Sequence, residues 1–60
     1  MDRNELLKFE GSKVAVYMSG HRVAGTIMQV RDDKFRFDRD NSGPVTMYNK
    51  PVTAIGNYYA

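Results

Sequence analysis

Two stretches of the chain, 14–30 and 45–56, alternate apolar and polar residues with the period of two that is typical of half-buried β-strands. The first stretch is interrupted at Ser19-Gly20, where a hairpin turn needs a residue that tolerates positive φ. The second is interrupted at Asn49-Lys50-Pro51, which predicts a short turn. With the charged segment between the two stretches, the pattern predicts strands at about 13–18, 21–30, 34–38, 44–48 and 52–58.

A short helix is expected before the first strand, at about 3–10. Asp2 and Glu5 have the D-x-x-E spacing of a capping box, and Gly11 can end the helix. Consecutive strands with short links favour an antiparallel meander, and Gly25 in the middle of a strand permits strong bending or close approach of another backbone. The expected fold is all-β, one domain over residues 1–60: a small, strongly bent, five-stranded antiparallel barrel with a short N-terminal helix.

The chain is short for a stable core. It has 60 residues and no cysteine, so disulfides and thiolate metal sites cannot staple it. Homo-oligomerisation is the remaining way to bury apolar surface and cover exposed strand edges. The alternative is a monomer in which Tyr58 and Tyr59 cover the chain's own core. No apolar run is long enough to span a membrane, so no membrane partner and a cytoplasmic location are expected.

The charge balance is mildly basic, with a net charge of +2, and its distribution matters more than its total. On a strand over 34–38, Lys34 and Arg36 share one face while Phe35 and Phe37 share the other. Aspartates are interleaved with the basic residues of this region. The simplest interpretation is a solvated strand face over a phenylalanine-lined core.

The residue types in the sequence give little support for a catalytic or metal site. His21 is the only histidine, and no cysteine is present to pair with it. The segment 38–43 resembles the start of a calcium loop, but its twelfth position is Asn49 where a bidentate glutamate is needed. We therefore expect no enzyme activity, no catalytic or metal-ligating residues, no cofactor and no small-molecule substrate.

Two segments carry a family resemblance: Val23-Ala24-Gly25-Thr26-Ile27 in one strand, and Tyr48-Asn49-Lys50-Pro51-Val52 across the last turn. They resemble the two-part signature of the Sm-like family, and within it the bacterial Hfq branch, over roughly 4–57. The first motif spans about 13–38 and the second about 44–58. The resemblance implies a closed homo-oligomeric ring of about five to seven subunits, in which the last strands pair with the neighbour's sheet.

The resemblance also implies binding of single-stranded, U-rich RNA on the face around the central pore. The residues that it places there are Lys50, Asn49, Phe35, Lys34 and Tyr48. Lys50 would contact phosphate or base, Asn49 a base edge, and the Phe35 ring would stack on the base. Two alternatives concern Phe35: it is simply a core residue, or an alignment without a gap puts Val30 and Arg31 at this position.

The opposite face of Hfq-like rings takes adenine-rich RNA, and four residues fall near the corresponding positions: Tyr17, Arg22, Gly20 and Thr53. Ala24 stands where the family commonly has a glutamine that reads adenine, which predicts weak adenine preference. The expected function is RNA binding with an RNA-chaperone role in regulation. The alternative is a structural or protein-interaction ring with little RNA affinity, because the Lys-His order of the family's last turn is replaced by Asn49-Lys50.

Overall fold

The computed structural model describes residues 1–59, so the last residue of the expected domain lies outside the described part. It contains one helix and five strands: α1 (Arg3–Leu7), β1 (Lys13–Met18), β2 (His21–Met28), β3 (Lys34–Arg39), β4 (Gly43–Tyr48) and β5 (Val52–Asn57). All five predicted strands are present, although β2 ends at Met28 rather than at residue 30. The period of two in apolar residues therefore located the strands correctly.

Helix α1 begins as the capping pattern predicted, because the Asp2 side chain accepts a hydrogen bond of 2.9 Å from the Glu5 backbone N–H. The helix is shorter than the predicted 3–10. The chain leaves it through turns, and Gly11, at φ +84°, donates its N–H to the Ile27 carbonyl at 2.7 Å. That bond ties the end of the helical segment to β2. Within residues 1–59, no helix has the length and apolar character that a membrane crossing requires.

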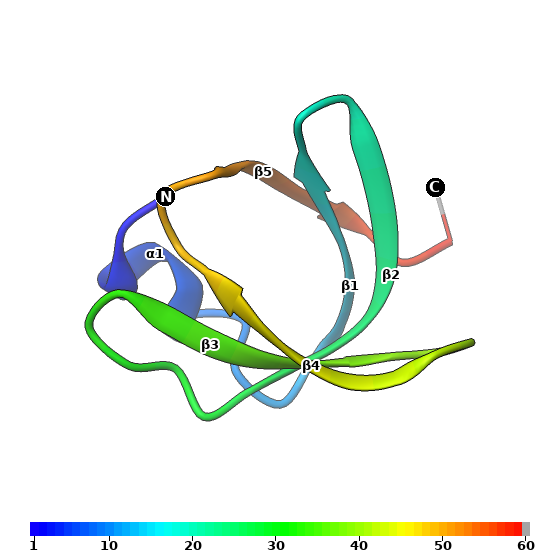
Figure 1. Ribbon diagram of the computed structural model, residues 1–60, viewed down its shortest axis with the longest axis horizontal. Coiled ribbons are helices and arrows are strands. Elements are labelled where there is room, and N and C mark those ends of the chain that lie inside the picture. The colour runs from blue at the N-terminus through cyan, green and yellow to red at the C-terminus, as the bar shows by residue number, and fades with distance from the viewer. Residues whose placement is uncertain (60) are drawn as a thin grey trace.

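The strands form one antiparallel sheet in the order β4-β3-β2-β1-β5 (Figure 1). The predicted meander is correct for β1 to β4 and wrong for β5, which pairs with β1 instead of β4. The sheet is strongly bent but stays open between β4 and β5 across the described residues. Five antiparallel strands with a short N-terminal helix are thus confirmed, whereas a closed barrel is not.

The hydrophobic core lies inside the bend. It consists of Leu6, Val14, Val16, Ile27, Val30, Phe35, Phe37 and Val52. Phe35 and Phe37 are both inward-facing residues of β3, and their rings pack edge to face with centroids 6.2 Å apart. Half-buried Val45 and Met47 of β4 and Ile55 of β5 extend this core to the two open edges of the sheet.

Gly25 allows β2 and β3 to approach closely, as its position in the strand predicted. A Cβ atom at Gly25 would overlap the backbone carbonyl oxygen of Asp38 and lie 3.0 Å from the Cα of Arg39, its partner in β3. The Gly25 position is also buried. A side chain here would have to push two paired strands apart, so glycine is required for this bend.

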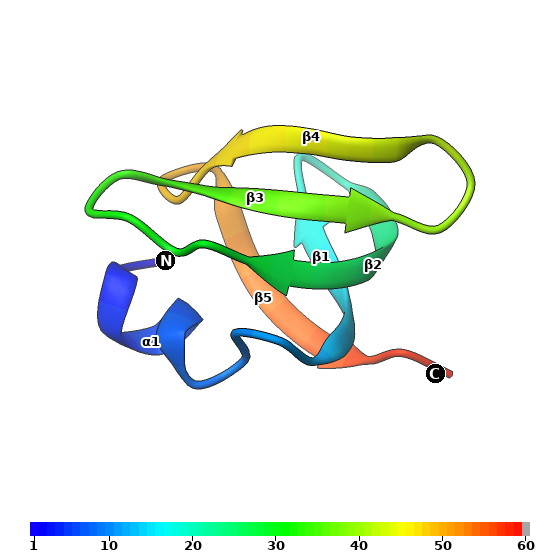
Figure 2. The same cartoon turned by 90° about the horizontal axis from the view of Figure 1, so that it is seen from below.

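One end of the bent sheet gathers several segments that are far apart in the sequence. Helix α1, the connection 29–33 between β2 and β3, and the turn 49–51 between β4 and β5 lie together in both views (Figures 1 and 2). The chain start is tied to the same place, because the Met1 amino group donates to the carbonyls of Asn49 and Val52 at 3.0 and 2.9 Å.

Replacing Gly25 by alanine tests the close approach of β2 and β3. We expect Gly25→Ala to lower the free energy of unfolding by about 2–3 kcal/mol, because the added methyl group overpacks against fixed backbone. Gly56→Ala is the matched control, since its added Cβ would meet only the side-chain ring of Tyr17, at 3.0 Å. Urea unfolding at one protein concentration measures both. Equal losses for the two variants would contradict this account of the bend.

Candidate nucleic-acid interface

The turn between β4 and β5 is anchored on the connection between β2 and β3. The Asn49 backbone N–H donates to the Asp33 carbonyl at 2.9 Å, and its side-chain Nδ2 donates to the carbonyls of Asp32 at 3.1 Å and Arg31 at 3.5 Å. The Val52 N–H closes the turn on the Asn49 carbonyl at 3.1 Å. Asn49 thereby holds the two loops in one fixed arrangement.

Asn49 is a buried anchor in this structure, which corrects its predicted role at a base edge. Its residue is 4% exposed, and its Nδ2 is occupied by the two backbone carbonyls. The side-chain Oδ1 is buried and has no hydrogen-bond partner within the described residues. A base could reach this amide only if the two loops separated.

Phe35 is likewise a core residue, and the prediction that its ring stacks on a base is corrected here. The residue is 1% exposed and its ring packs against Phe37. The core alternative for Phe35 is therefore confirmed. In the ungapped alternative, Val30 is also in the core and Arg31 is exposed. Neither of these residues has an aromatic ring that could stack on a base.

Tyr48, unlike Phe35, is an aromatic residue whose side chain is exposed at the end of the sheet that carries the β4–β5 turn. It is 60% exposed and sits directly opposite Lys34 in the β3–β4 register. Because paired residues of antiparallel strands point to the same side of the sheet, the Tyr48 ring and the Lys34 ammonium share one face. Exposed Lys50 follows in the turn. An exposed aromatic ring with one lysine opposite it and a second lysine in the adjoining turn suits single-stranded nucleic acid, which offers bases to stack and phosphates to neutralise.

A hollow of about 330 Å³ lies beside the turn and has mixed charge. It is lined by Met1, Asp2, Asp32, Asp33, Asn49 and Lys50. Asp32 is engaged by Arg3 through an ion pair of 3.1 Å. No aromatic ring lines the hollow, so a base that entered it would find polar contacts and no stacking partner. Within residues 1–59, no group of three or more histidine, aspartate or glutamate side chains is placed to hold a metal ion.

The structure also brings together the four residues predicted for the opposite face. Tyr17 is paired with Arg22, and its carbonyl accepts a hydrogen bond of 3.1 Å from the Thr53 hydroxyl. Gly20 is in the adjoining turn at φ +77°. The Arg22 guanidinium donates to the Tyr58 carbonyl at 2.7 Å, so part of its donor capacity holds the end of the chain.

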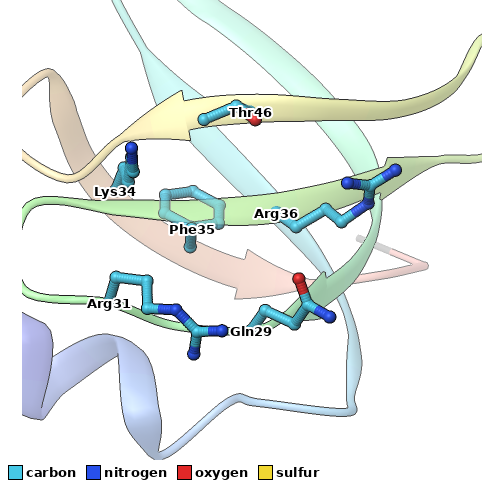
Figure 3. A pocket seen from close by; sticks show the side chains of 6 residues that line it. All are labelled: Gln29, Arg31, Lys34, Phe35, Arg36 and Thr46. Carbon is cyan, nitrogen blue, oxygen red and sulfur yellow. The ribbon is translucent and has the colours of Figure 1, made fainter.

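A second basic cluster combines Lys34, which the resemblance assigned to the pore face, with two arginines that it did not assign to a site. Arg31, Lys34 and Arg36 line a hollow of about 120 Å³ on the outer face of β3 and β4, together with Gln29 and Thr46 (Figure 3). The Phe35 backbone passes beneath it. The alternation along β3 did indicate that Lys34 and Arg36 share a face, but nothing local in the sequence indicated that Gln29 and Arg31 fold back beside them.

Substitution of Asn49 tests its anchoring role. Asn49→Asp replaces the donating Nδ2 by an oxygen that faces two backbone carbonyls, so we expect it to destabilise the protein by about 2–4 kcal/mol. Asn49→Ala loses the same two bonds but also removes the unpartnered Oδ1, and we expect a smaller loss. Urea unfolding measures both, and an aspartate variant as stable as the parent would rule out the anchor.

In comparisons with known proteins, no protein-family model, no curated protein and no solved structure matches this chain. The resemblance to the Sm-like family therefore rests on the motif residues alone.

Proposed function

We propose that this chain assembles into a closed, Sm-like homo-oligomeric ring that binds single-stranded, U-rich RNA at the face carrying the β4–β5 turn. The observation that carries the proposal is the exposed Tyr48 ring opposite Lys34, next to a turn that contains exposed Lys50 and is held by Asn49. The proposed activity is binding without catalysis or cofactor. It goes with a cytoplasmic role in RNA regulation, such as bringing two RNA strands together.

Assembly is supported by the two open edges of the sheet. β4 and β5 are the terminal strands in the sheet order, and each has half-buried apolar residues: Val45 and Met47 in β4, and Ile55 in β5. If β4 of one copy pairs with β5 of the next, backbone hydrogen bonds are satisfied and these side chains are covered together. This contact joins two different surfaces, so repetition around a rotation axis closes a ring.

RNA binding is supported by the chemistry of the exposed side chains. A base stacked on Tyr48 is worth about 1–3 kcal/mol, and lysines attract phosphates without regard to sequence. The partly exposed Ala24 has no amide with which to recognise adenine, so the opposite face gives little selectivity for adenine-rich RNA. We therefore favour U-rich over A-rich strands.

A second candidate function is a structural or protein-interaction ring with little RNA affinity. The burial of Phe35 and Asn49 favours it, because two of the five residues expected at the pore face are not accessible. The carboxylates of Asp2, Asp32 and Asp33 around the adjacent hollow also oppose a polyanion.

Fluorescence anisotropy with labelled oligo-U and oligo-A separates these two functions. We expect Tyr48→Ala to weaken oligo-U binding by about 1–3 kcal/mol through lost stacking. We expect Lys50→Ala to weaken it by about 1 kcal/mol and to reduce its salt dependence. Lys8→Ala, at an exposed position in the turn after α1, is the control for loss of a lysine. Parent affinity weaker than about tens of micromolar at low salt would support the scaffold function instead.

Light scattering coupled to size exclusion tests the assembly. We expect one species whose mass is a fixed multiple of the single chain and which persists on dilution, because closure removes every free edge. A variant with Met47→Lys at the half-buried β4 position should shift the protein to smaller species, while Thr46→Lys at the neighbouring exposed position should not. A parent protein of monomer mass at micromolar concentration would contradict the ring.

A further inference from the structure

The outer face of β3 and β4 carries an ordered row of polar and aromatic side chains. Along β3, Lys34, Arg36 and Asp38 point outward, and they are paired with Tyr48, Thr46 and Pro44 of β4. Alternate residues of a strand are about 6.6 Å apart, which is comparable to the separation of neighbouring phosphates in an extended nucleic-acid strand. The row runs from the exposed Tyr48 ring at one end to the Asp38 carboxylate at the other.

The basic side chains on this face make no ion pair or hydrogen bond within the described residues. Within the described residues, no carboxylate pairs with Arg31, Lys34 or Arg36, and their side chains make no hydrogen bond; the ion pair seen there joins Arg3 to Asp32. This contrasts with Arg22 and Arg39, whose guanidinium groups donate to backbone carbonyls and so help to hold the fold. Three exposed cations that hold no structural contact are available for an anionic partner.

The connection after β2 places Arg31, together with the neutral side chain of Gln29, beside the two cations of β3. Gln29 has φ +47°, in the left-handed region that glutamine seldom adopts. At this residue the chain changes direction and Val30 enters the core. The Gln29 and Arg31 side chains lie alongside β3, Gln29 below Arg36 and Arg31 below Lys34 and Phe35 (Figure 3). The Arg31 N–H donates to the Lys34 carbonyl at 2.8 Å and fixes this connection to the start of β3.

The dimensions of the hollow narrow the class of ligand. At about 120 Å³ it is smaller than the roughly 300–1,000 Å³ of pockets that enclose small organic ligands. It is sufficient for a phosphate group, with Arg36 and Arg31 as charged donors and Gln29 and Thr46 as neutral hydrogen-bonding groups. Such a shallow site suits one link of a polymer that continues across the surface.

We propose that the outer face of β3 and β4 is a second RNA contact surface, on which the hollow lined by Gln29, Arg31, Arg36 and Thr46 binds a backbone phosphate. The inference rests on the proposed RNA-binding function and extends it. An RNA strand whose base stacks on Tyr48 continues outward over Lys34 and Arg36, away from the turn, and its path ends where Asp38 repels it. The protein thus binds a longer stretch of RNA than the β4–β5 turn alone can contact.

Oligo-U of increasing length, from about 4 to 16 nucleotides, tests this path by fluorescence anisotropy at about 50 and 200 mM salt. We expect Arg36→Gln to weaken binding of the longest oligomers at least threefold, to leave the shortest unchanged, and to reduce the salt slope by about 0.7. Arg36→Lys should retain most of the affinity. Lys8→Gln is the matched control for charge, since Lys8 lies outside the row.

Gln29→Gly gives a second variant in which loss of folding is not a concern. Glycine is unstrained at positive φ, so thermal stability should hold or rise while the affinity for long oligomers falls. In ¹⁵N spectra, the Thr46 and Arg36 amides should shift on titration with long oligo-U and not with the shortest. Polyglutamate of matched charge is the competitor that distinguishes RNA from an acidic protein.

Three results would overturn the proposal. If Arg36→Gln and Gln29→Gly bind long oligo-U like the parent while Lys50→Ala and Tyr48→Ala do not, the second surface is refuted and the turn site stands. If polyglutamate displaces RNA from this face as well as oligo-U does, the face recognises acidic chains in general. If the parent protein binds no oligo-U at either salt concentration, both the turn site and the second surface are refuted.

Discussion

The short link between β4 and β5 constrains the whole sheet. These two strands are at opposite edges of five, so in a flat sheet they would be about 19 Å apart, at about 4.8 Å per strand spacing. The link 49–51 provides four Cα–Cα steps from Tyr48 to Val52, which reach at most about 14 Å. The sheet must therefore curl until its two edges come near each other. Gly25 makes that curl possible, because at this point the β3 backbone occupies the space that a side chain would need.

The same constraint determines where a binding surface can form. Curling brings the β4–β5 turn against the β2–β3 connection, and Asn49 joins the two through its backbone and side-chain donors. Polar groups from distant parts of the sequence are consequently fixed at one end of the molecule. The same hydrogen bonds occupy the Asn49 side chain, which the Sm-like resemblance assigned to RNA binding. The side chains that remain exposed are Tyr48 and the cations on the outer face of β3.

The strands could be predicted from the sequence because their signal is local. The alternation Lys34-Phe35-Arg36-Phe37 alone indicated that both phenylalanines face the core, and the structure confirms it. The motif comparison assigned Phe35 to a ligand site, and the strand periodicity was the better guide to it. The pairing of β5 with β1 could not be predicted, since no local pattern specifies which distant strand is a partner. The placement of Gln29 and Arg31 beside β3 could not be predicted for a similar reason: it depends on the left-handed conformation of Gln29, which a glutamine in a sequence does not indicate.

Pro44 has a consequence for how copies of the chain can meet. It lies in β4, an edge strand, where a proline nitrogen is tolerated on the side that faces solvent and not on the side of the ladder. If another strand pairs along this edge, its carbonyl finds no N–H donor at Pro44, so the pairing is confined to the segment from Val45 to Tyr48. A slip of the incoming strand toward Gly43 would leave one of its carbonyls without a donor. In the proposed ring, the missing N–H at Pro44 therefore disfavours alignments that extend the pairing toward Gly43.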